Sequence, residues 1–164
     1  NSFNNHCDRI KMANIAQTVN VLQAMILTEG PKMILTPTYH VYYMYKVHQD
    51  ATMLPIELKC DDYVFGDGSI PSLSASASKD AAGRVNISLC NLDPKRVAKL
   101  SCELKGAKAS RVSGRVLTSD DINAHNTFDK PRTIEPLVFT AAKLEGDELT
   151  VTLPAKSVVV LEVE

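Results

Sequence analysis

The spacing of hydrophobic residues along this chain changes near residue 50. After that point apolar and polar residues alternate, as at 54–58, 85–89 and 149–153, which is the period of two typical of half-buried strands. Turn residues such as Gly66-Asp67-Gly68 separate the alternating stretches. Short strands at intervals of about ten residues predict a β-sandwich or barrel over residues 51–164. We expect strands near 54–58, 70–77, 85–89, 97–104, 111–118, 137–139, 149–153 and 158–163.

Residues 37–49 predict a helix and hold four of the five tyrosines of the chain. Thr36 can cap the N-terminus of this helix, and Pro37 suits its first turn, where the missing N–H costs nothing. Residues three, four and seven apart share a helix face, so one face should pack on the sandwich or a neighbouring helix while Lys46 stays exposed. The packing face consists of Val41, Met44, Tyr45 and His48, and the other face of Tyr39, Tyr43 and Lys46.

Apolar residues before position 36 predict a second helix and a buried strand. Asn4 or Asn5 can cap a helix that runs to about Val21 with two apolar stripes, so it should be covered on more than one side. The run at 24–27 is continuous and apolar, which suits a strand buried on both faces in a parallel sheet. This helix–strand–helix unit lacks neighbouring strands. We therefore expect residues 1–50 to be the tail of an α/β domain; a small helical subdomain packed on the sandwich is the alternative.

Charge and cysteine usage narrow the class of protein. The formal net charge of −1 argues against nucleic acid or an anionic membrane as a partner, because no basic patch can neutralise phosphates. No apolar run approaches the roughly 20 residues of a membrane helix. The start of the chain lacks a signal-peptide pattern, which is uninformative if it is not the natural start. Cys7, Cys60, Cys90 and Cys102 form no C-x-x-C pair and predict free buried thiols.

Residues that could carry chemistry are few. The adjacent aspartates at 61–62 and 120–121 should point to opposite faces, so neither pair converges on one atom. His40 and His48 lie eight residues apart, too far for chelation by successive helix turns. Asn86-Ile87-Ser88 matches a glycosylation sequon but falls inside an expected strand. We expect no catalytic residue, no metal site and no cofactor in this chain.

Glu29 is the exception among these residues. It directly follows the expected buried strand, and α/β barrels keep their active sites at the carboxyl ends of their strands. The competing interpretation is a solvated loop acid.

Several runs resemble glycoside hydrolase family 51, the α-L-arabinofuranosidases. The runs are NNHCDRIKMANIAQ at 4–17, VNVLQAMILT at 19–28, LTPTYHV at 35–41, MYKVHQ at 44–49, NISLCNLD at 86–93 and LPAKSV at 153–158. The resemblance covers nearly the whole chain and is strongest in the first fifty residues. It implies a (β/α)8 barrel followed by a jelly-roll-like β-sandwich, so the fold would be mainly β, with a helix–strand–helix remnant of the barrel at 1–50 and the sandwich at 51–164. The resemblance also implies that the parent's N-terminal segment adds to this sandwich.

The same resemblance implies what the parent protein does. Family members are retaining enzymes in which two glutamates act as acid/base and nucleophile. Both glutamates belong to earlier barrel strands, and neither motif occurs in this chain. Glu29 and Thr36 remain as candidates for lining the sugar site. The chain would be the C-terminal fragment of an enzyme that releases terminal arabinofuranose from plant arabinan or arabinoxylan oligosaccharides.

The fragment's own role would then be structural, and it is expected to be inactive and part of a homo-oligomer. The parent's compartment stays open between cytoplasm and periplasm. The alternative is a stand-alone carbohydrate-binding or oligomerisation module. Sugar-binding modules usually stack sugars on exposed aromatic rings, and only Tyr63, Phe65, Phe128 and Phe139 follow residue 50.

Overall fold

The fold is a mainly β, sandwich-like arrangement of antiparallel sheets. The computed structural model describes residues 1–16, 18–106 and 109–164. Its larger sheet has the strand order β10-β9-β13-β7-β6-β3, and a smaller sheet has the order β11-β12-β8. The larger sheet comprises β3 (Thr52–Leu54), β6 (Leu73–Lys79), β7 (Val85–Asn91), β9 (Val112–Leu117), β10 (Leu137–Val138) and β13 (Ser157–Val163). The smaller sheet comprises β8 (Ala98–Glu103), β11 (Ala142–Glu145) and β12 (Glu148–Leu153).

The main core lies between these two sheets, as the period-two pattern predicts. On β12, Leu149, Val151 and Leu153 are buried and the residues between them are exposed. Leu161 and Val159 of β13 face them with no exposed surface. Alternate residues of a strand point to opposite faces of its sheet, so this alternation fixes which face of each strand enters the core. The expected mainly β, sandwich-like fold is confirmed, and the domain boundary at residue 50 stays a prediction.

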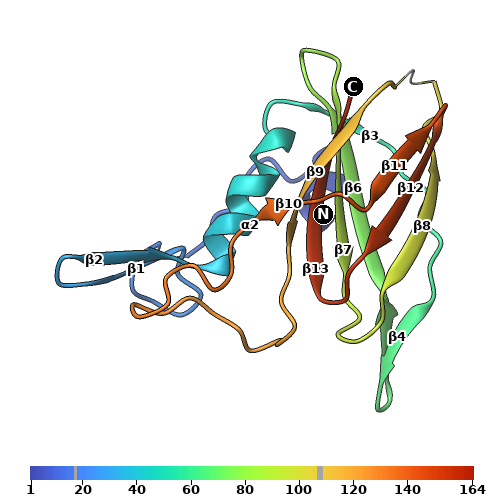
Figure 1. Cartoon of the computed structure of the whole chain (residues 1–164). Helices are drawn as coiled ribbons and strands as arrows, with labels where there is room; N and C mark the ends of the chain where they lie inside the picture. Colours follow the sequence, from blue (N-terminus) through green and yellow to red (C-terminus); the bar gives the residue numbers. More distant parts are fainter. Residues whose placement is uncertain (17, 107–108) are drawn as a thin grey trace.

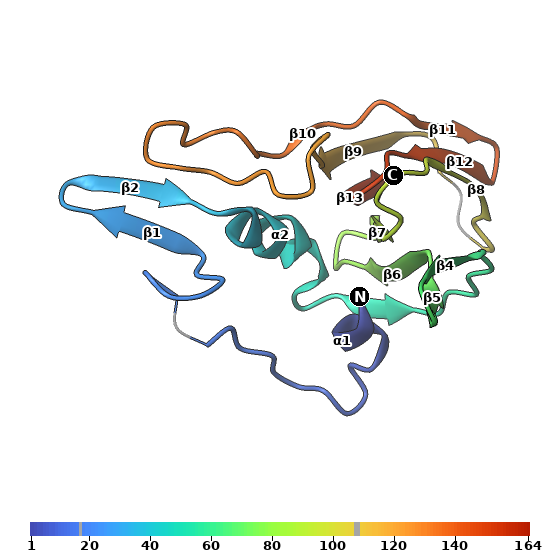
Figure 2. The ribbon, with the colours of Figure 1, turned by 90° about the horizontal axis from the view of Figure 1, so that it is seen from below.

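A third layer covers the outer face of the larger sheet. It contains α2 (Pro37–Tyr45), the 3-10 turn η1 (Lys46–His48) and the short helix α1 (Ser2–Asn5). Figure 2 shows these elements on the side of the larger sheet that faces away from β11, β12 and β8. Met44 of α2 is buried in a second apolar cluster with Leu117, Ile134 and Val160. The expected helix at 37–49 and its packing face are therefore confirmed.

The helix expected up to Val21 is wrong. Only α1 is helical, and residues 6–16 run irregularly along the outside of the molecule (Figure 2); position 17 lies outside the described residues. Asn20 and Gln23 have positive φ angles of 55° and 59°, which a helix does not accommodate. Short helices depend on packing of an apolar face, and that face has no cover here: Met12 is 77% exposed and Leu22 91%.

The buried parallel strand expected at 24–27 is also wrong. Instead β1 (Ile26–Glu29) pairs antiparallel with β2 (Lys32–Leu35), and the hairpin projects from the body of the molecule (Figure 1). Gly30 has a φ of 56° at the first position of the two-residue turn, a place where glycine is preferred. Ala24 is buried, but Ile26 and Leu27 are only half-buried. A second hairpin, β4 (Asp62–Phe65) with β5 (Gly68–Pro71), turns at Gly66.

Side-chain exposure corrects the expectation of buried cysteines and agrees with the placement of the sequon inside a strand. The four cysteines are free, but Cys7 is exposed and the other three are only half-buried. Asn86 of the sequon is buried, so a glycan could not be attached in the folded chain. Across the described ranges, no helix is long and apolar enough to cross a membrane.

Candidate functional site

Thr36 acts as the N-cap of α2. Its hydroxyl donates a hydrogen bond of 2.7 Å to the carbonyl of Ala24 and accepts one of 3.4 Å from the backbone N–H of Tyr39. An N-cap of this kind satisfies one of the free N–H groups at a helix start. These two bonds tie the end of the β1–β2 hairpin to α2.

Glu29 lies at the other end of the hairpin. It is exposed and pairs with Lys32 across the turn, so it does not follow a parallel strand as expected. Leu35, next to Thr36, pairs with Ile26. Thr36 lies four residues along the strand from Lys32, the partner of Glu29, and this corresponds to roughly 13 Å. The structure does not bring the two residues together, and their role in binding substrate remains a prediction.

Serine side chains on the outer face of β6 and β7 form a polar layer beneath η1 and α1. The two ring nitrogens of His48 lie 2.7 Å from the Ser78 hydroxyl and 2.6 Å from the Ser88 hydroxyl. Asn1 accepts hydrogen bonds from Ser76 at 2.8 Å and from Tyr45 at 2.9 Å. A serine beside a histidine can mark a nucleophile and its base, but Ser88 is completely buried and no substrate could reach it. This layer therefore holds the N-terminal segment and η1 on the sheet.

Burial, together with the smaller effect of the nearby N-terminal ammonium, lowers the pKa of His48 from 6.5 to about 4. Between pH 6.5 and 4 the unfolded chain thus binds a proton that the folded chain does not. We expect the contribution of His48 to the free energy of unfolding to be constant above pH 6.5 and to fall as the pH drops to 4. The loss should be about 1–2 kcal/mol, because solvent around the half-buried ring screens part of the effect.

Urea unfolding of the wild-type chain and of His48→Gln at pH 7.0, 5.5 and 4.5 would measure this dependence. Glutamine can hydrogen-bond to the serines but does not titrate in this range. The variant should lose less stability on acidification. If the free energy of unfolding fell equally with pH in the two proteins, His48 would not be the group responsible for the pH dependence.

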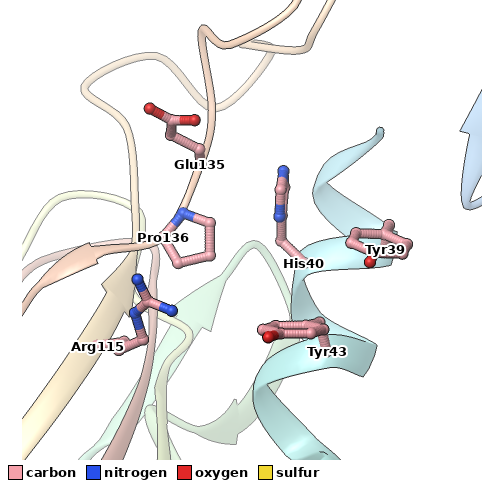
Figure 3. A pocket seen from close by; sticks show the side chains of 6 residues that line it. All are labelled: Tyr39, His40, Tyr43, Arg115, Glu135 and Pro136. Carbon is pink, nitrogen blue, oxygen red and sulfur yellow. The ribbon is translucent and has the colours of Figure 1, made fainter. Parts of the chain in front are cut away.

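A shallow cavity of about 230 Å³ lies between α2 and the chain around β9 and β10. Figure 3 shows Tyr43 and His40 on the helix side, with Pro136 and Arg115 opposite them. Tyr39 and Tyr43 stack with ring centroids 6.1 Å apart and planes at 15°. The Lys46 ammonium lies 4.0 Å from the centroid of the Tyr43 ring, a cation–π contact. The cavity is lined by Tyr39, His40, Tyr43, Arg115, Glu135 and Pro136.

The two charged side chains that line this cavity have opposite signs. Arg115 contributes one positive charge and Glu135 one negative charge, and neither takes part in the ion pairs formed among the described residues. Burial lowers the pKa of His40, and the nearby Glu135 carboxylate only partly offsets this effect, so the imidazole is neutral at pH 7. The sequence predicted the Tyr39–Tyr43–Lys46 face. It gave no signal for Arg115 and Glu135, which reach the cavity only through the folding of the sandwich.

Comparisons with known proteins agree on one family. The chain matches the family model described as the alpha-L-arabinofuranosidase C-terminal domain over residues 1–157. It is 46% identical over 163 residues to an intracellular exo-alpha-L-arabinofuranosidase of Bacteroides ovatus, covering 99% of this chain and 32% of that protein. It is 28% identical over 158 residues to an exo-alpha-(1->6)-L-arabinofuranosidase of Bifidobacterium longum, covering 93% of this chain and 30% of that protein.

Solved structures agree with the sequence comparisons. The GH51 arabinofuranosidase from Xanthomonas axonopodis pv. citri superposes with a TM-score of 0.96 at 46% identity, covering 99% of this chain and 33% of that one. The thermostable GH51 enzyme from Thermotoga petrophila gives a TM-score of 0.83 at 26% identity, covering 96% and 35%. The chain thus spans about a third of the length of the relatives it matches. The chain belongs to the alpha-L-arabinofuranosidase C-terminal domain family and corresponds to the C-terminal domain of GH51 arabinofuranosidases.

Proposed function

We propose that this chain is the C-terminal portion of a retaining α-L-arabinofuranosidase. The parent enzyme releases terminal arabinofuranose from arabinan or arabinoxylan oligosaccharides, which bind in a (β/α)8 barrel encoded outside this chain. The observation that carries this proposal is the 46% identity, over nearly the whole chain, to an enzyme named as an exo-alpha-L-arabinofuranosidase. The activity of the full-length parent on arabinan and arabinoxylan oligosaccharides, with release of arabinose as the readout, would test it.

The role of this chain within the parent is structural: residues 1–50 are the C-terminal remnant of the barrel, and residues 51–164 form the sandwich beside it. Apolar side chains exposed along the first fifty residues support this division. Burying one such side chain contributes about 1.5–3 kcal/mol, so a surface that exposes several of them favours a covering partner. Exposed apolar residues of this segment are Phe3, Met12, Val19, Leu22 and Met33.

We expect the isolated chain not to hydrolyse aryl arabinofuranosides. A retaining mechanism needs two carboxyl groups roughly 5 Å apart on either side of the glycosidic bond, and the family resemblance assigns both to barrel strands outside this sequence. Release of nitrophenol from an aryl arabinofuranoside would be measured for the chain and for the parent enzyme in parallel. Turnover that co-purifies with the chain and disappears on mutation of one of its own carboxylates would contradict the prediction.

We further propose that the isolated chain forms a homo-oligomer through residues 1–48, since the same exposed apolar side chains can be covered by a second copy. Sedimentation velocity at micromolar concentrations should show a dimer or a larger species. The double variant Leu22→Ser, Met33→Ser removes two of the exposed apolar side chains and should shift the distribution toward monomer. A wild-type chain that sediments strictly as a monomer would overturn the proposal.

A cytoplasmic location for the parent is supported by the Bacteroides ovatus relative, whose name describes an intracellular enzyme. Fractionation of cells that produce the parent, followed by detection of this domain, would separate a cytoplasmic from a periplasmic location.

A further inference from the structure

The cavity at α2 has a size that restricts its occupant. Its volume of about 230 Å³ is below the ~300–1,000 Å³ of pockets that enclose drug-sized ligands. A single ring, or one ring of a longer chain that continues into solvent, is therefore the largest group it can hold.

The charges restrict the chemistry of that ring. An anion would be attracted by Arg115 but repelled by Glu135. A cation would be attracted by Glu135 but repelled by Arg115. A neutral ligand with several hydroxyl groups can use both: the guanidinium donates hydrogen bonds and the carboxylate accepts them. The tyrosine hydroxyl groups can do either. The lining therefore suits a neutral polyhydroxyl compound better than an ion.

The rings beside these groups supply an apolar wall. Tyr43 and His40 line one side and Pro136 the other (Figure 3). Aromatic rings offer a large contact area for the C–H groups of a ligand at small entropic cost. The stack with Tyr39 and the cation–π contact with Lys46 already hold the Tyr43 ring in place. Such preorganisation reduces the entropy that the side chain loses on binding.

We propose that this cavity binds one neutral sugar ring of an oligosaccharide, with the ring against Tyr43 and its hydroxyls hydrogen-bonded to Arg115 and Glu135. The preference for a neutral sugar follows from the cavity itself, whereas the choice of an arabinofuranosyl sugar rests on the proposed function. Sugar binding is thus assigned to the tyrosine helix and its junction with the sandwich. The few aromatic residues after position 50 are not needed for it.

NMR titration of the ¹⁵N-labelled 164-residue chain with arabinotriose, xylotriose and inorganic phosphate would test the proposal. A shallow site of this size should give a dissociation constant of about 1–10 mM for arabinotriose, with shifts at Tyr43, Arg115 and Glu135. Tyr43→Ala should weaken binding about tenfold or more and Arg115→Ala about fivefold. Tyr42→Ala is the matched control, because Tyr42 is a comparably exposed tyrosine on the same helix that does not line the cavity.

Each outcome of the titration decides something. Saturable shifts that map to the cavity and are lost in Tyr43→Ala but not in Tyr42→Ala support the site. The absence of saturation, equal weakening by the two tyrosine variants, or binding of phosphate without binding of either sugar would overturn it. Amide spectra of each variant verify that it is folded. The parent enzyme can release arabinose while this chain binds no sugar, in which case the site fails and the proposed function stands. If this chain binds xylotriose but its parent releases no arabinose, the sugar site stands and the proposed function fails.

Discussion

Replacing Tyr45 by alanine is expected to lower the free energy of unfolding by about 3 kcal/mol, the low end of the range for aromatic residues in cores. The Tyr45 ring packs against the second apolar cluster, which contains Met44 and Val160. Burial raises the pKa of Tyr45, so its hydroxyl stays protonated and can donate to Asn1 at 2.9 Å. The substitution therefore removes both packing beneath α2 and one bond that holds the N-terminal segment. Urea unfolding followed by circular dichroism would measure the loss.

Two matched variants separate these contributions. Tyr45→Phe keeps the ring and removes the hydroxyl, which also lies 3.4 Å from the Cys90 sulfur, so it should cost about 1 kcal/mol. Tyr42→Ala removes an exposed tyrosine from the same helix and should change stability by no more than about 0.5 kcal/mol. If Tyr45→Ala and Tyr42→Ala had equal effects, the assignment of the packing face of α2 would be wrong.

The sandwich strands could be predicted because their pattern and their surroundings agree. On β7, Ile87 and Leu89 face the core and Ser88 the opposite layer, and the same alternation is visible in the sequence. Three strands were missed, β2, β4 and β11. On β11, Ala142 and Leu144 are half-buried, whereas Lys143 and Glu145 are exposed. This is a correct alternation over too few residues to stand out.

The serine-rich strand β6 is more central than its composition suggested. Ser76 and Ser78 lie on its outer face and are buried beneath α1 and η1, where Asn1 and His48 are their hydrogen-bond partners. Serine is usually exposed, and buried polar groups need partners. Those partners come from residues about 30 and 75 positions away in the chain, so local sequence could not reveal that this face is covered.

The first 35 residues were misread for a different reason. Their apolar residues, such as Met12 and Leu22, have the spacing of a covered helix, but in this chain they face solvent. Periodicity indicates which residues would share a face and says nothing about whether a partner is present to cover it. The cavity has the same origin, since Arg115 and Glu135 meet Tyr43 only after the sandwich has folded against α2.

Gly114 of β9 occupies the most tightly packed glycine position that the structure describes. A methyl group added there would lie 2.6 Å from the Leu161 side chain, 3.1 Å from the Val160 carbonyl and 3.5 Å from Phe139. Leu161 is completely buried between the sheets, so it has little room to move, and protein cores respond to added volume with strain. Glycine is thus required at this position by the close approach of β13.

Replacing Gly114 by valine is therefore expected to lower the free energy of unfolding by about 3 kcal/mol, the upper part of the usual range for overpacked cores. Valine favours strands, but that preference is worth less than about 1 kcal/mol and cannot offset the clash. The matched control is Ser113→Val, because Ser113 is the exposed neighbour on the same strand and should change stability by no more than about 0.5 kcal/mol. The double variant Gly114→Val, Leu161→Val shortens the clashing side chain and should recover part of the lost free energy of unfolding. A double-mutant cycle measured by urea unfolding would show this recovery. Equal stability of the two single valine variants at 113 and 114 would show that β9 and β13 are not packed as closely as the structure indicates.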